Sequence, residues 1–491
     1  MVLLFLIFMP ITAAVVSLAV RHDKIRRLIL VLAAAAHTAV TASLWINRPA
    51  PAWSGTVALD PLGLLFLSIT SVLFLAAAFY AKGYLGREEK GHRKDFQEGL
   101  IFSNAPEAVF IACLLFFLGA MSSVTLFQHF GLIWVGVEAT TLASAPLIYF
   151  HRHKRSLEAT WKYLMICSVG IALALMGYLL LAISATDDSG GSLPMVISDL
   201  VKNGASLRVT WLKAAFILFM VGYGTKMGLA PLHTWLPDAH SEAPSVVSML
   251  LSGALLNCAF LGILRALQVC AAAGQAEFAR DMMTVLGFFS MLVAAVFILG
   301  QTDYKRMLAY SSVEHMGILA VGIGLGGAAA FGSMLHAVNH SLTKGMLFLL
   351  AGNILALYKT KSSNEVKGVL KALPVTGALW LLGFLAITGS PPFGPFLSEF
   401  TILKGALGDG HYFLAGLYLF LLAVIFIGMS VVFLKMAQGA APASEDPGGV
   451  REGASSILPP AALAVAVTVL GVYVPAPLQE VLTQASKALG I

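Results

Sequence analysis

The chain has 491 residues, of which 58% are hydrophobic and only 11% are charged, and its mean hydropathy is +0.85. Apolar runs of about twenty residues, the length that crosses a bilayer as a helix, recur from one end to the other. The composition excludes a soluble globular protein and predicts an all-α polytopic membrane protein. The formal charge of +6 indicates basic loops facing anionic lipid rather than nucleic-acid binding.

Apolar runs between turn and charge clusters predict about fourteen transmembrane helices. The first run has no basic residue before it and a basic cluster after it, the reverse of a cleavable signal peptide, so we expect it to be retained. The polar connections 82–106, 184–210 and 436–455 are too short to form a soluble domain. In chain order the expected helices are 3–20, 27–46, 59–81, 107–127, 130–150, 158–183, 211–242 with a break, 246–270, 282–300, 307–328, 331–357, 374–406 with a break, 411–434 and 456–475.

Lysine and arginine concentrate in every second connection, as expected when helices are correctly enumerated. The first group of connections carries Arg21, Lys24, Arg26 and Arg27, then Lys82, Arg87, Lys90, Arg93 and Lys94, then Arg152, Lys154 and Arg155, then Lys305 and Arg306, then Lys359, Lys361, Lys367 and Lys371, and finally Lys435 and Arg451. The alternate connections carry Arg48, then Lys202 and Arg208, then Arg265 and Arg280, then Lys404. This asymmetry predicts a multi-pass protein of the cell inner membrane with both termini outside, on the periplasmic side.

Four expected helices contain an ionisable residue that a membrane span should avoid: Glu138, Lys226, Lys344 and Glu399. A charge at the bilayer centre costs about 2.5–3.5 kcal/mol on insertion scales, so four of them predict a polar path through the membrane. Glu138 needs a cation or a proton, and Lys226 is the expected partner. Such a pair acts either as a proton switch or as a static ion pair that joins two helices.

Two expected helices are interrupted next to these charges. Non-helical backbone at membrane depth is tolerated only where it faces protein or water, so each break suggests a hydrated cavity. The interrupting residues are Gly228, Pro231 and Pro237 after Lys226, and Gly389, Pro391, Pro392, Gly394 and Pro395 before Glu399.

His336, His340 and Lys344 are four residues apart and therefore share one helical face, with Asn339 and Thr343 beside them. Histidine titrates near neutrality, so this stripe can relay protons. A metal ion shared by His336 and His340 is a weaker alternative, because no carboxylate or thiolate lies near them on this helix. Packed structural histidines are a further alternative.

Bond chemistry by the chain itself is not indicated. Glycine-rich phosphate loops, nucleophile elbows and haem signatures are absent from the sequence. The four cysteines occur singly, without C-x-x-C spacing, and are read as core residues: Cys113, Cys167, Cys258 and Cys270.

Long motifs of this sequence resemble the antiporter-like membrane subunits of respiratory complex I and its relatives. Within that superfamily they most resemble component F of hydrogenase-4 and similar membrane-bound nickel-iron hydrogenases of the formate-hydrogenlyase group. The resemblance spans residues 105–435, whereas the two ends match only in hydropathy. The motifs lie at 138–175, 221–257, 303–318, 336–353 and 390–405.

The resemblance implies fourteen transmembrane helices with two inverted five-helix repeats, each containing one broken helix. The implied divisions are 1–106 (helices 1–3), 107–270 (first repeat), 271–435 (second repeat) and 436–491 (loop and last helix). It assigns Glu138, Lys226, Lys344 and Glu399 to a central hydrophilic axis that passes protons. His233 is a further expected member, and His315, Glu314 and Lys162 are lesser candidates that could equally face loops.

One residue departs from the complex I pattern. The helix after the first break usually carries a lysine in its apolar run, whereas this chain has Asn257. An amide cannot carry a proton, although it can orient water. In this respect the chain resembles the hydrogenase-type members of the superfamily. The substitution also weakens the case for transferring the complex I mechanism to this chain.

The expected function is proton translocation within a redox-driven membrane complex, most plausibly a hydrogenase. No cofactor is expected in this chain; a nickel-iron centre and iron-sulfur clusters are expected in partner subunits of a peripheral arm, beside other membrane subunits. Three alternatives stay open: a subunit of a sodium/proton antiporter complex, a passive membrane anchor, and a solute symporter.

Overall fold

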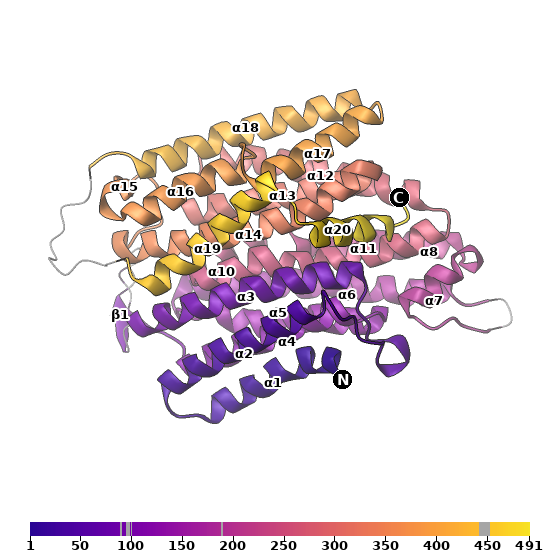
Figure 1. The fold of residues 1–491 in the computed structure, drawn as a ribbon, viewed down its shortest axis with the longest axis horizontal. Coiled ribbons are helices and arrows are strands. Elements are labelled where there is room, and N and C mark those ends of the chain that lie inside the picture. Colours follow the sequence, from indigo (N-terminus) through magenta and orange to yellow (C-terminus); the bar gives the residue numbers. More distant parts are fainter. Residues whose placement is uncertain (89–90, 95–98, 100, 188–189, 441–451) are drawn as a thin grey trace.

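The structure is a computed structural model that describes residues 1–88, 91–94, 99, 101–187, 190–440 and 452–491. It is a bundle of long helices running roughly parallel and antiparallel to one another (Figure 1). Within the described residues, twelve segments are long and apolar enough to cross a membrane. They are α1 (Val2–Ala19), α2 (Asp23–Ser43), α3 (Pro61–Arg87), α4 (Glu107–Leu126), α5 (Phe130–Ile148), α6 (Lys154–Ser184), the continuous segment α10 (Ser245–Leu250), η3 (Leu251–Leu255) and α11 (Leu256–Ala272), α12 (Ala276–Ile298), α13 (Tyr304–Leu325), α14 (Gly327–Tyr358), α18 (Tyr412–Ala437) and α19 (Ala454–Val472).

The two remaining expected spans are each divided into shorter helices, so the count of fourteen and the inverted repeats stay predictions. The first is divided between α8 (Val209–Met227) and α9 (Trp235–Glu242). Gly228 ends α8 with φ 86°, and a Cβ there would lie 2.5 Å from Leu236 Cδ1, so glycine is needed sterically and conformationally. Pro237 was expected within the break but lies in the first turn of α9, where a proline loses no helical hydrogen bond.

The second break separates α16 (Pro374–Ile387) from α17 (Gly394–Gly408). Gly389 has φ 66°, and the N–H of Ser390 donates to the Leu385 carbonyl to close the end of α16. Pro395 lies in the first turn of α17, so it begins this helix rather than interrupting it. Both predicted interruptions are therefore confirmed, although each is shorter than the sequence suggested.

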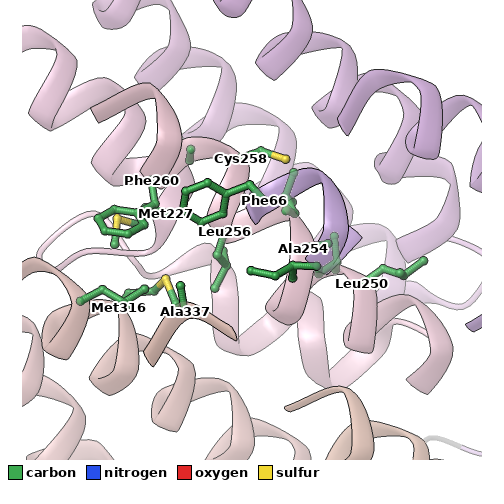
Figure 2. Packing of buried hydrophobic residues seen from close by; sticks show 14 of the residues in the cluster. Phe66, Met227, Leu250, Ala254, Leu256, Cys258, Phe260, Met316 and Ala337 are labelled. Atoms are coloured by element: carbon green, nitrogen blue, oxygen red, sulfur yellow. The ribbon is translucent and has the colours of Figure 1, made fainter. Parts of the chain in front are cut away.

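The centre of the bundle is shielded from the surface by packed side chains. The segments α10–α11 and α13 are buried along their whole apolar length. Figure 2 shows the packing around them, with Phe66 of α3, Met227 of α8, Phe260 of α11 and Met316 of α13 among the buried residues. The Phe66 and Phe260 rings meet edge to face, with centroids 6.0 Å apart. A polar group in this region has only other protein groups, or trapped water, to bond.

The ends of the bundle differ in charge. The connections that carry the clustered lysines and arginines lie at the left of Figure 1, whereas both termini lie at the right. This agrees with the predicted asymmetry, although it does not say which end faces the cytoplasm. Lys90 and Arg451 lie outside the described residues.

Several short elements were not predicted. The amphipathic helix α20 (Ala476–Lys487) follows α19 and packs against α3 and α14. Its mixed sequence carries no membrane-spanning signal, which is why hydropathy did not reveal it. The others are η1 (Trp53–Gly55), the antiparallel pair β1 (His92–Lys94) and β2 (Ile101–Ser103), α7 (Ile197–Lys202), η2 (Gly204–Ser206) and α15 (Val369–Ala372).

Candidate functional site

Lys226 lies in the last turn of α8, directly before the first break, and its side chain is fully buried. Its Nζ donates to Thr141 Oγ1 at 2.6 Å and to the Tyr163 hydroxyl at 2.7 Å. The ammonium also lies 4.6 Å from the centroid of the Tyr163 ring. Two hydroxyls from α5 and α6 therefore replace the water that this lysine would otherwise bind.

Glu138 and Lys226 interact electrostatically but form no ion pair, so the alternative of a static ion pair is wrong, whereas their role as a proton switch stays a prediction. Thr141 stands between them, because it lies one helical turn after Glu138 on the same face of α5. Its hydroxyl accepts from Lys226 and donates to Glu138 Oε2 at 3.3 Å, while Ser168 Oγ donates to Oε1 at 3.3 Å. The Thr141 hydroxyl is therefore hydrogen-bonded to both ionisable side chains.

Asn257 connects the first half of the bundle to α14. Its Nδ2 donates to the Gly253 carbonyl at 2.9 Å and to Ser341 Oγ at 2.7 Å. Its Oδ1 is buried and has no hydrogen-bond partner among the described residues. Asn257 lies two residues after the end of the π-helical turn η3, a feature frequently found at functional sites. The residue thus bridges helices, as a fixed polar group rather than a charge carrier.

The stripe predicted on α14 is confirmed as a buried row, because His336, His340 and Lys344 are all fully buried. Lys344 Nζ donates to the Leu308 carbonyl at 2.7 Å, and its electrostatic partner is Glu314 of α13. Both nitrogens of His340 lack a hydrogen-bond partner within the described chain. The row faces α13 rather than a loop.

His315 of α13 sits against this row, contrary to the expectation that it could be loop-facing. Its ring centroid is 5.0 Å from that of His336 and 5.1 Å from that of His340, whereas His336 and His340 are 6.5 Å apart. His315 Nδ1 and His336 Nε2 are hydrogen-bonded at 2.9 Å. The close histidine pair therefore joins two helices and is not the pair four residues apart.

Glu399 of α17 completes this group from the far side of the second break. One ligand atom each from His315, His336 and Glu399 lie within 4.8 Å of one another. Ser398, the residue before it, bonds His336 Nδ1 at 3.0 Å through its hydroxyl. A Cβ on Gly389 would lie 2.0 Å from Glu399 Oε2, so this glycine makes room for the carboxylate.

The remaining candidates lie toward the surface. His233, in the first break, is buried beside the Tyr310 ring at 6.2 Å, and its Nδ1 has no partner in the described part of the chain. Lys162 is half-exposed and pairs with Glu158 at 2.7 Å and with Asp238 at 2.9 Å. Lys162 is therefore a surface residue of the bundle.

Sequence reasoning missed several members of the site. His240 of α9 is fully buried, stacks on Phe348 at 4.9 Å and interacts electrostatically with Lys344. Thr141 could have been found from its spacing to Glu138, but Tyr163 and His240 meet their partners only through packing. The other missed groups are Ser341, Ser398 and Lys305, whose Nζ donates to the Ala243 carbonyl at 2.6 Å.

The chain was compared with known families and proteins. Residues 128–426 match the family described as NADH:quinone oxidoreductase/Mrp antiporter, transmembrane. The chain is 37% identical over 382 residues to a hydrogenase-4 component F homolog of Methylacidiphilum infernorum (isolate V4), covering 77% of this chain and 78% of that protein.

Solved structures share the fold. A chain of the membrane-bound sulfane sulfur reductase, an archaeal respiratory membrane complex, superposes with a TM-score of 0.85 at 20% identity, over 100% of this chain and 98% of that one. A chain of the Mrp complex from Dietzia sp. DQ12-45-1b superposes with a TM-score of 0.83 at 20% identity, over 99% and 96%.

Proposed function

Because the chain belongs to the family of NADH:quinone oxidoreductase and Mrp antiporter membrane subunits, we propose that it moves protons as part of a redox-driven membrane complex. The observation that carries the proposal is a series of polar groups in the interior of the bundle, near the two helix breaks. It begins at Glu138, which is partly buried, and continues through the buried residues Thr141, Lys226, Asn257 and Ser341 to the α14 row and Glu399.

Ionisable groups in the interior of the bundle lower the stability of the fold. Each one costs free energy to keep charged away from water, and apolar residues in the same positions would often make the fold more stable. Proton movement needs the opposite, namely groups whose charge changes when a neighbour gains or loses a proton. The hydroxyl of Thr141 between Lys226 and Glu138 supplies such a connection.

The complex is of hydrogenase type in this proposal, which the relative named as a hydrogenase-4 component F homolog supports. Other membrane subunits lie beside this chain, and a peripheral arm carries a nickel-iron centre and iron-sulfur clusters. Electron transfer there supplies the free energy, while this chain performs no redox chemistry itself. The membrane is the cell inner membrane, with both termini on the periplasmic side.

The proposed internal organisation follows the two breaks. Residues 107–270 and 271–435 form two inverted repeats, each with one broken helix, preceded by residues 1–106 and followed by 436–491. Lys226 and Glu399 then occupy the charged positions beside the breaks of the first and second repeats.

The test is substrate-driven proton uptake in inverted membrane vesicles that contain the whole complex. Wild type is compared with Lys226→Ala and Glu399→Gln at matched assembly, and electron transfer is measured in parallel. We expect protons moved per electron to fall severalfold in both variants while redox turnover persists or falls. Unchanged pumping per electron would make this chain a passive anchor whose charges are structural.

Sodium exchange is a second candidate, favoured by the superposition on the Mrp complex. The same vesicles distinguish it through the dependence of proton movement on external sodium. Proton uptake that is independent of sodium supports the first proposal, whereas uptake that requires sodium supports exchange.

A further inference from the structure

We propose that His315, His336 and Glu399 form a binding site for one divalent transition-metal ion, with Zn²⁺ as the best-fitting ion. The three side chains come from α13, α14 and α17, and one ligand atom from each lies within 4.8 Å of the others. None is more than 7% exposed. Two imidazoles and one carboxylate are a ligand set that Zn²⁺ accepts while keeping a fourth position open.

An unsatisfied carboxylate oxygen points to a missing cation at this place. Glu399 Oε1 is buried and has no hydrogen-bond partner among the described residues. His315 Nε2 has no close partner either, but the Ile387 backbone lies near it and would accept the hydrogen that moves to Nε2 when Nδ1 binds an ion. No described lysine, arginine or histidine forms an ion pair with Glu399. A buried carboxylate without a cation must be protonated or paired, and a metal ion would pair it.

The hydrogen bonds around His336 hold its imidazole ring in the orientation and tautomer that a metal-binding histidine needs. Ser398 Oγ donates to the Pro395 carbonyl at 2.9 Å, so it accepts from His336 Nδ1 at 3.0 Å. This network assigns the proton to Nδ1 and leaves a lone pair on Nε2. Metal-binding histidines commonly donate their second N–H in this way, which fixes the ring and its tautomer.

The spacing suits an ion of tetrahedral preference. Ligand atoms about 2.0–2.1 Å from Zn²⁺ lie roughly 3.3 Å from one another. His315 Nδ1 and His336 Nε2, 2.9 Å apart, would separate slightly as the ion takes the place of the hydrogen between them, and that hydrogen would move to His315 Nε2. Mg²⁺ and Ca²⁺ prefer six or more oxygen ligands, and copper(I) prefers sulfur, so neither class fits this set.

The second break offers the route by which an ion would arrive. Pro391 and Pro392 are exposed on the isolated chain, and Gly389 is half-buried against Glu399 Oε2. Since glycine carries no side chain, the carboxylate is separated from the break only by backbone. A bound ion would occupy lone pairs that the proposed proton path needs, and it would therefore slow proton uptake. That effect rests on the proposed function, whereas the metal site itself does not.

The binding test uses the purified full-length chain in detergent, stripped with a chelator and then titrated with Zn²⁺ or Co²⁺. We expect one ion per chain, a tetrahedral Co²⁺ visible spectrum, and a zinc absorption-edge spectrum showing two imidazoles. His315→Gln, His336→Gln and Glu399→Gln should each weaken Zn²⁺ binding at least tenfold. His37→Gln is the matched control, because His37 is also buried but bonds Ser71 and Ser122 far from this site.

Ser398→Ala guards against variants that fail to fold, because it removes only the hydrogen bond behind His336 and should weaken binding about tenfold. Wild-type affinity in all four site variants, or a six-oxygen zinc shell in wild type, would overturn the site. In vesicles, a site that binds Zn²⁺ without slowing proton uptake would stand as a metal site while contradicting the proposed proton path through it. Loss of pumping in Glu399→Gln without any wild-type Zn²⁺ binding would overturn the metal site alone.

Discussion

At the scale of single residues, Thr141 decides whether Lys226 and Glu138 communicate. We expect Thr141→Val, which keeps the shape and removes the hydroxyl, to lower the protons moved per electron, by no more than Lys226→Ala does. The variant leaves both side chains in place but removes the hydroxyl to which each of them is hydrogen-bonded. The measurement is proton uptake by inverted vesicles of the whole complex.

Thr140→Val is the matched control for that variant. Thr140 is the neighbouring buried threonine, but its hydroxyl donates only to the Val137 carbonyl of its own helix. Equal pumping in the two variants would show that the hydroxyl between the charges is dispensable.

A second residue pair makes a prediction about pH. Burial raises the pKa of the Asp60 carboxyl, but the bidentate Arg265 guanidinium, with bonds of 2.5 and 2.6 Å, overcomes it, and the net pKa is lowered. A lowered pKa stabilises the fold above the ordinary carboxyl pKa, and that contribution is lost as pH falls through the folded-state value. We expect Asp60→Asn to cost about 3 kcal/mol at pH 7 because it leaves Arg265 unpaired.

The measurement is thermal unfolding of the detergent-solubilised protein at a series of pH values. The stability difference between wild type and Asp60→Asn should shrink as the pH falls below about 4, because the unfolded wild-type chain then binds a proton at Asp60 that the folded chain resists. A difference that stays constant down to pH 3 would contradict the assignment.

At the scale of elements, the break between α16 and α17 depends on Gly389. We expect Gly389→Ala to lower the free energy of unfolding by about 1–3 kcal/mol, because alanine is strained at a φ of 66°. Its Cβ would also overlap Glu399 Oε2, so pumping should fall even where the variant assembles. Thermal unfolding and vesicle uptake measure the two effects separately.

Gly408→Ala, at the end of α17, provides the control, since a Cβ there meets nothing within 4 Å. Stability and pumping should stay close to wild type in that variant. If the two alanine variants behaved alike, the geometry of the break would have no special role.

The breaks also show what a sequence can and cannot predict about such elements. Glycine and proline at 228 and 231, and at 389, 391 and 392, located both interruptions, because their backbone restrictions act locally. The partners of Lys226 were not predictable, since Tyr163 lies on another helix and the contact depends on packing. His315 was left undecided for the same reason: one sequence position does not reveal which helix its side chain faces.

At the scale of the whole molecule, the end of the bundle with the basic connections should face the cytoplasm. Lys371→Cys and Asp409→Cys place exposed thiols at opposite ends of the α16–α17 segment. In right-side-out vesicles, we expect a membrane-impermeant maleimide to label Asp409→Cys at once and Lys371→Cys only after permeabilisation. The reverse pattern would invert the predicted topology.

The order of the long helices followed from hydropathy across the molecule, because each apolar run must be buried in lipid or protein. Helix α20 escaped that reasoning, since its stability comes from packing against α3 and α14 rather than from its own composition. Sequence thus predicted the frame of the bundle and four ionisable residues of its interior, three of them buried and Glu138 partly buried, whereas the contacts between them required the folded chain.

The hydrogen-bonded series His315, His336, Ser398 has a direction, and that direction limits how it works. A proton that binds His315 Nε2 would shift the Nδ1 hydrogen to His336 Nε2, and the hydrogen of His336 Nδ1 would then pass to Ser398 Oγ, which converts both rings to their other tautomers. Because the Ser398 hydroxyl donates to the Pro395 carbonyl, which does not keep a proton, this hydroxyl must first turn to another acceptor. The series then holds its hydrogens in reverse order, and a second proton cannot follow until both rings are restored. Such a segment conducts one proton at a time, and it conducts the next only after both rings have returned to their first tautomers.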